Sequence, residues 1–100
     1  MNNARRSRIR RLIQNLKACR KVDDRWVGVD WEFVEGELQD LLEEEQEAMD
    51  NIPENLQDGD RYMVAEESVG SLEEAIDAID PDDYNCAQDI VSILEQIDGI

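Results

Sequence analysis

The sequence contains no histidine, two cysteines and five aromatic residues among 100 residues. Histidine is the commonest general base of enzymes, and without it neither cysteine can be activated by an imidazole. A structural zinc site needs four histidine or cysteine ligands, but the chain offers only Cys19 and Cys86. We therefore predict no catalytic residues, no metal site and no cofactor, in a protein that is not an enzyme.

Long apolar runs are also missing. No stretch of about 18 apolar residues occurs, so no membrane span and no membrane contact are expected. Basic residues interrupt the N-terminal segment, which excludes the apolar centre of a signal peptide. We predict a cytoplasmic protein whose cysteines stay reduced. A Cys19–Cys86 disulfide is the alternative if the first and last helices pack together.

Basic side chains are nearly absent from the last three quarters of the chain. Nine of the ten lie in residues 1–25, and the other is Arg61. With two acids, residues 1–25 carry +7; with 24 acids, residues 26–100 carry −23, which together give the net charge of −16. This separation of basic from acidic residues along the chain gives information about binding partners and not about the fold. We interpret residues 1–29 as a basic helix and hinge, and residues 30–100 as an acidic helical body.

Apolar residues recur at steps of three and four throughout the chain, which predicts helices. An amphipathic helix is expected over residues 3–21, another over 31–50, a third with heptad spacing up to residue 79, and a fourth up to the end. No strand alternation is found. The predicted fold is all-α, either an antiparallel helical hairpin or a three- to four-helix bundle.

Candidate capping residues set the expected boundaries. Gly28 favours a break, with Asp30 capping the second helix, although residues 3–50 also keep the spacing of one long helix. Asp58 is the expected N-cap of the third helix. Asp80 is the expected N-cap of the fourth, with Pro81 at its first position.

Residues 45–57, with the sequence EQEAMDNIPENLQ, are followed by Arg61-Tyr62 and by EEAID at residues 73–77. This pattern resembles small acidic helical proteins of phages and mobile elements of low-GC Gram-positive bacteria, which share a DN-[LI]-PE-[NS]-LQ connector. The resemblance spans roughly residues 43–80 and departs at residues 58–60, where the group usually has serine. It implies a helical fold and a host-cell location, but no agreed biochemical activity.

Read physically, the connector is a corner between two helices. Pro53 ends the first helix, because the residue before a proline is pushed out of helical geometry. Leu56 is expected to close the bottom of the bundle.

Acidic side chains on the predicted helices form a candidate partner-binding surface that could imitate nucleic acid. Its residues are Glu32, Glu35, Asp40, Glu43, Glu44, Glu47, Glu66, Glu67, Glu73, Glu74 and Asp77. The alternative is a surface that only keeps the protein soluble.

The basic segment and the nearby tryptophans form a second candidate surface, for a partner or for self-association. Its residues are Arg5, Arg6, Arg8, Arg10, Arg11, Lys17, Arg20, Trp26 and Trp31. The segment could instead pack on the chain's own acidic body. The tryptophans are then buried anchors beneath it.

Three functions are compatible with these surfaces. The preferred one is a phage or mobile-element interaction protein, acting as an acidic inhibitor of a host defence nuclease complex. The alternatives are a structural or assembly accessory and a DNA-contacting regulator that uses the basic segment. We expect a protein partner with a basic surface. For the oligomeric state, a homodimer and a monomeric bundle both stay open. We rank direct nucleic-acid binding lower because the acidic body would repel phosphates.

Overall fold

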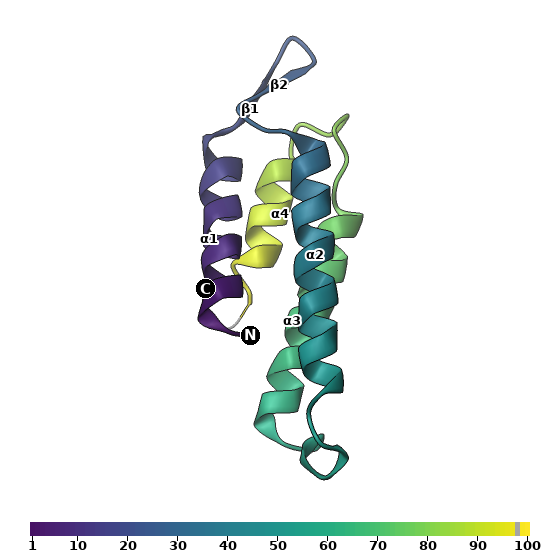
Figure 1. The fold of residues 1–100 in the computed structure, drawn as a ribbon. Helices are drawn as coiled ribbons and strands as arrows, with labels where there is room; N and C mark the ends of the chain where they lie inside the picture. The colour runs from purple at the N-terminus through teal and green to yellow at the C-terminus, as the bar shows by residue number, and fades with distance from the viewer. Residues whose placement is uncertain (98) are drawn as a thin grey trace.

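The computed structural model describes residues 1–97, 99 and 100. The elements in this part are α1 (Asn3–Ala18), β1 (Arg20–Val22), β2 (Arg25–Val27), α2 (Trp31–Asp50), the 3₁₀ helix η1 (Glu54–Leu56), α3 (Asp60–Asp77) and α4 (Cys86–Leu94). The long helices α2 and α3 run antiparallel, α1 and α4 lie beside their upper half, and the β-hairpin projects beyond them (Figure 1). The molecule measures 54 × 21 × 18 Å. The predicted helical character is confirmed.

The apolar core lies where all four helices meet. α1 contributes the four buried side chains Ile9, Leu12, Ile13 and Leu16, which its three-and-four spacing places on one face. The largest fully buried side chains from the other helices are Leu38, Leu41, Leu72, Ile90 and Leu94. Since α1 and α4 cover only the upper half, the lower ends of α2 and α3 form a two-helix extension (Figure 1).

The prediction that the chain has no strands is wrong. α1 ends at Ala18, not at residue 21, and residues 20–27 form an antiparallel hairpin in which Lys21 pairs with Trp26. The turn residues Asp23 and Asp24 have φ of 51° and 63°. Two central residues with positive φ are what a tight hairpin turn requires, and aspartate tolerates this region better than most residues.

The predicted break before α2 is confirmed, and the single long helix over residues 3–50 is wrong. Gly28 has a φ of 84°, which suits glycine alone without strain. The Asp30 carboxylate caps α2 by accepting hydrogen bonds from the backbone N–H groups of Glu32 and Phe33. α2 then continues to Asp50, ahead of Pro53, as predicted.

Two predictions for the α2–α3 connection are wrong. Leu56 in η1 is 54% exposed, and the buried residue at this end is Ile52, at 6% exposure. Asp58 does not cap α3: the N-cap is Gly59, which has no side chain to accept a hydrogen bond. In α3 itself, Ala65, Val69 and Leu72 of the heptad are buried.

The predicted start of the fourth helix at Asp80–Pro81 is also wrong, because α4 begins at Cys86. The carboxylate of Asp80 accepts a hydrogen bond from the N–H of Asp82, and that of Asp83 accepts one from the N–H of Asn85. These local turns give the backbone an alternative to the helix. Among the residues described, no helix is long and apolar enough to cross a membrane.

Candidate functional site

The basic helix α1 is joined to the acidic helix α2 by a buried ion pair. Arg5 Nε lies 2.9 Å from Glu45 Oε2, and the Glu45 side chain is 1% exposed. The Met1 amine adds a second cation, 3.4 Å from Glu45 Oε1. A carboxylate without such partners would be costly to bury. Arg5 and Glu45 therefore hold α1 against α2.

A second bridge between the same helices is made by Arg8. Its guanidinium donates hydrogen bonds to both Glu37 and Glu44, which lie two helical turns apart on α2. The hydrogen bonds to Glu37 and then to Glu44 raise the pKa of Arg8 above its usual value. The basic segment is thus packed on the chain's own acidic body through Arg5 and Arg8, one of the two arrangements that the sequence left open.

The other basic residues of the predicted contact surface have different surroundings. Lys17 Nζ lies 3.5 Å from Glu95 Oε1, Arg10 donates to the Gly99 carbonyl, and Arg6 donates to Asn3 Oδ1. Arg11 and Arg20 are exposed and form no ion pair with the residues that the structure describes. Some basic residues of the predicted contact surface therefore contact the chain itself, and others are exposed charges.

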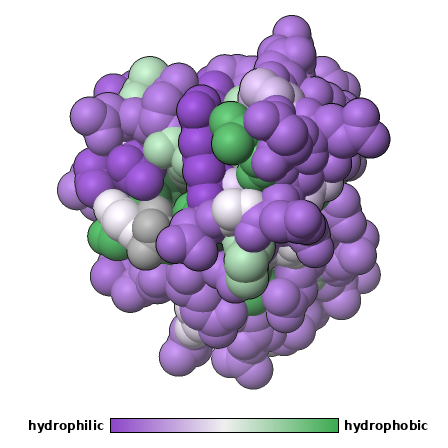
Figure 2. All heavy atoms as spheres, turned by 90° about the horizontal axis from the view of Figure 1, so that it is seen from below, coloured by the Kyte–Doolittle hydropathy of each residue, from purple (hydrophilic) through white to green (hydrophobic). Residues whose placement is uncertain are grey.

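Most of the predicted acidic surface is exposed on α2 and α3. The exposed members are Glu32, Glu35, Asp40, Glu43, Glu47, Glu66, Glu67, Glu73, Glu74 and Asp77. Glu44 differs, since it is partly buried and paired with Arg8. Seen from the η1 end, along the long axis, the surface is mostly hydrophilic with small separate apolar patches (Figure 2).

The two tryptophans pack on each other at the base of the hairpin. Their ring centroids are 5.1 Å apart in an edge-to-face arrangement, and both rings are partly buried against the core. Trp26 Nε1 donates to the Pro81 carbonyl at 2.8 Å, which Lys21 Nζ also contacts at 2.6 Å. Trp31 Nε1 is buried with no hydrogen-bond partner among the described residues.

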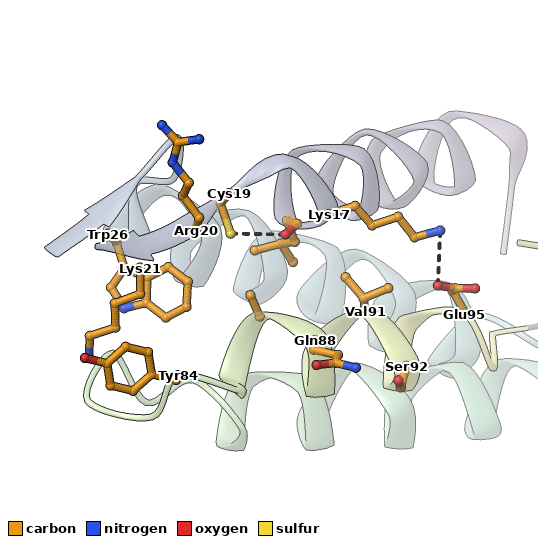
Figure 3. Close-up of a pocket in the computed structure, with 12 residues that line it drawn as sticks. Lys17, Cys19, Arg20, Lys21, Trp26, Tyr84, Gln88, Val91, Ser92 and Glu95 are labelled. Atoms are coloured by element: carbon orange, nitrogen blue, oxygen red, sulfur yellow. Dashed lines mark hydrogen bonds and ion pairs between the residues drawn. The ribbon is translucent and has the colours of Figure 1, made fainter. Parts of the chain in front are cut away.

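An open groove of about 630 Å³ lies between the end of α1, the hairpin and α4. Figure 3 shows Lys17 reaching Glu95 across one end of this groove, with Lys21, Trp26 and Tyr84 grouped at the other. Burial raises the pKa of the Cys19 thiol, which lines the groove, and that of the buried Cys86 thiol; both cysteines are free. Cys19 therefore contributes a thiol to the lining of the groove, whereas Cys86 lies outside the lining.

Sequence reasoning missed Glu45, although a signal was present. Val34, Leu38 and Leu41 lie on the buried stripe of α2, and the next step of four falls on Glu45. It also missed the exposed face of the hairpin. Among the described residues, no group of three acidic or cysteine side chains is placed to hold a metal ion.

Comparison with known proteins adds no relative. No protein-family model, curated protein or solved structure matches the chain.

Proposed function

We propose that the protein is a non-enzymatic interaction protein whose acidic helices α2 and α3 bind a basic, nucleic-acid-binding surface of another protein. The observation that carries this proposal is the uncompensated charge of the two helices. Twelve of their acidic residues are exposed and form no ion pair with a described residue: Glu32, Glu35, Asp40, Glu43, Glu47, Asp50, Asp60, Glu66, Glu67, Glu73, Glu74 and Asp77. Arg61 is the one basic residue on either helix.

The density of this charge is close to that of nucleic acid. Twelve acids against Arg61 leave eleven net negative charges along α2 and α3, which lie side by side. At 1.5 Å per residue, the 20-residue α2 is about 30 Å long, so one net charge falls about every 2.7 Å. Duplex DNA carries one charge per about 1.7 Å of axis, and one strand carries one per about 3.4 Å. A groove that follows phosphates would meet a similar field.

Rigidity supports the same role. The carboxylates are held on two helices packed against each other, with α1 attached to the far edge of α2 through Arg5 and Arg8. A partner therefore orders little backbone when it binds, which lowers the entropic cost of the complex. The same ion pairs commit Arg5 and Arg8 to the chain itself, which makes reading of DNA by α1 the weaker alternative.

The resemblance of residues 43–80 to acidic phage and mobile-element proteins supports the view that this binding takes place in a bacterial host cell. In the host cytoplasm, the partner would be a basic protein of a defence complex, such as a nuclease. Binding would occupy the channel through which nucleic acid passes, and the nuclease would be inhibited without any chemical step.

Competition with DNA tests the proposal. A catalytically inactive, basic nuclease is bound to a fluorescent duplex oligonucleotide, and fluorescence anisotropy is followed as the protein is added. We expect displacement of the DNA at 50 mM salt. Direct binding of the protein to the nuclease, measured without DNA, should weaken at least tenfold between 50 and 200 mM salt because screening weakens the contact. A matched pair of triple variants locates the surface.

The first variant, Glu35→Gln/Glu66→Gln/Glu74→Gln, removes three charges from α2 and α3. The second, Asp23→Asn/Asp82→Asn/Asp89→Asn, removes three exposed charges outside these helices. Only the first should lose most of its potency. Failure of the parent protein to displace DNA, or an equal loss in both variants, would reject the proposed function.

A further inference from the structure

The outer face of the β-hairpin combines exposed cations with exposed apolar side chains. Arg20 lies opposite Val27 and Val22 opposite Arg25, so these four side chains share one face, while Lys21 and Trp26 share the other. Val22 and Val27 are 45% and 46% exposed. Arg20 and Arg25 form no ion pair with any described residue, in a chain with 26 acids.

The hairpin is fixed in place by its other face. Lys21 and Trp26 both donate to the Pro81 carbonyl, and the Tyr84 hydroxyl donates to Asp24 at 2.9 Å. These contacts attach the hairpin to the α3–α4 connection, as the grouping of Lys21, Trp26 and Tyr84 in Figure 3 illustrates. Because the inner face is committed to these contacts, the arginines and valines of the outer face remain directed away from the body.

A surface of opposite character lies between α2 and α3. It is an open groove of about 410 Å³ in which Leu42 and Ile76 are the apolar members, both partly buried. Its other lining residues are Gln39, Gln46 and three carboxylates, Glu43, Glu73 and Asp77. None of these carboxylates forms an ion pair with a described residue.

We propose that the hairpin face of one copy of the chain docks in the α2–α3 groove of a second copy. The two surfaces are complementary in both properties that matter at an interface: two arginines meet three carboxylates, and two valines meet Leu42 and Ile76. Arginine is the cation best suited to such a contact, since its planar guanidinium can bind a carboxylate through two hydrogen bonds.

The contact is intermolecular because the hairpin of each copy is held at the end of the molecule, beyond α1 and α4 (Figure 1). The groove, in contrast, is lined by residues of α2 and α3. It accounts for exposed valines on a projecting two-stranded hairpin, an element of marginal stability by itself. Each copy carries both halves of the contact, so a dimer can form by reciprocal docking and a chain by head-to-tail docking.

Docking would cover Glu43, Glu73 and Asp77, which also belong to the acidic surface of the proposed function. A basic partner and a sister hairpin would then compete for the groove. The inference stands without the proposed function, because self-association through Arg20, Arg25 and the valines requires no basic partner protein.

Charge exchange tests the contact by sedimentation-equilibrium analysis of the purified chain at 50 mM salt. The variant Arg20→Glu/Arg25→Glu and the variant Glu43→Lys/Glu73→Lys should each weaken self-association at least tenfold. An equimolar mixture of the two should restore it, since the unchanged hairpin of the second variant fits the unchanged groove of the first, and the acidic hairpin of the first fits the basic groove of the second. The circular dichroism spectrum and melting curve of each variant establish that it is folded.

Two controls carry the same charge changes elsewhere. Arg11→Glu/Arg61→Glu changes two exposed arginines, and Glu66→Lys/Glu67→Lys changes two exposed acids of α3 outside the groove. Both should associate within threefold of the parent. The inference is overturned if the parent protein stays monomeric up to 0.5 mM, on the order of the highest useful concentration for a weak contact. It is also overturned if self-association weakens equally in the controls, or if the mixture of the two variants does not recover it. The hairpin variant keeps the acidic helices, so its displacement of DNA from the nuclease reports on the inhibitor proposal separately.

Discussion

Arg5 on α1 donates a hydrogen bond from Nε to the carboxylate of Glu45 on α2, a residue 40 positions away, over 2.9 Å. The helix with the most basic residues is therefore anchored inside the most acidic region. Arg8 makes a similar contact on the partly exposed side of the same helices. The charge separation along the sequence thus becomes, in the fold, an attraction between adjacent helices. The exposed acids of α2 and α3 are left without an ion pair to any residue that the structure describes.

Removing the charge of Glu45 should strongly destabilise the protein. We expect Glu45→Gln to lower the free energy of unfolding by about 3 kcal/mol, because the Met1 amine would lose its carboxylate partner and the partly buried Arg5 would keep only its 4.0 Å contact with Glu44. Urea unfolding at pH 7 measures the change. The exposed residue Glu43 is the control, and Glu43→Gln should change stability by less than about 0.5 kcal/mol.

The double variant Arg5→Leu/Glu45→Leu tests whether the loss in Glu45→Gln comes from leaving a cation without its partner or from losing the ion pair itself. Replacing both members of a buried ion pair by apolar residues is often neutral. We expect the double variant to recover at least half of the loss. If it is less stable than Glu45→Gln, the pair contributes more than the cost of burying its charges.

The two predicted caps around α2 and α3 should differ in energy. Asp30 accepts two backbone hydrogen bonds at the start of α2, so Asp30→Ala should cost about 1 kcal/mol. Asp58 is exposed and precedes the true N-cap, Gly59. Asp58→Ala should therefore change stability by less than about 0.5 kcal/mol. Thermal unfolding followed by circular dichroism compares them, and equal losses would contradict the assigned caps.

The helices could be predicted because their signal is repeated many times. In α2 the positions of Val34, Leu38 and Leu41 agree with each other, and Asp30 and Pro53 mark its ends. In a strand of three residues the alternation of side chains is repeated only once. The sequence of the hairpin at residues 20–27 therefore could not be distinguished from the last turn of a helix. Aspartate likewise occurs both as a helix cap and in local turns. The sequence alone therefore does not show that Asp80 forms a turn and not the N-cap of the fourth helix.

The candidate surfaces were harder to predict than the helices. A chain with 26 acids gives no composition signal for the one that is buried among the described residues. Glu45 differs from Glu43 only by its position on the apolar stripe of α2. The pairing of Arg8 with Glu37 and Glu44 depends on which helix faces α1. No spacing within a single helix contains that information.

The stability of the protein should fall at alkaline pH through its thiols. Burial raises the pKa of Cys19 and Cys86 in the folded state, so unfolded thiols lose their protons first, from about pH 8.5. This contribution is complete below that pH and is lost as the pH rises toward the folded pKa values. Urea unfolding between pH 7 and 10 should show the decline. The variant Cys19→Ser/Cys86→Ala should show a shallower one, and an unchanged slope would contradict the assignment.

The two tryptophans should differ in how much stability is lost with the indole N–H. Trp26 Nε1 donates to the Pro81 carbonyl and helps to hold the hairpin, so Trp26→Phe should cost about 1 to 2 kcal/mol. Trp31 Nε1 is buried with no partner among the described residues, and an unsatisfied buried donor costs about 1–3 kcal/mol. In Trp31→Phe, removal of that donor offsets the lost ring packing, and stability should stay within about 0.5 kcal/mol of the parent. Chemical unfolding followed by circular dichroism compares both variants, and a larger loss for Trp31→Phe than for Trp26→Phe would show that the Trp31 N–H is satisfied in solution.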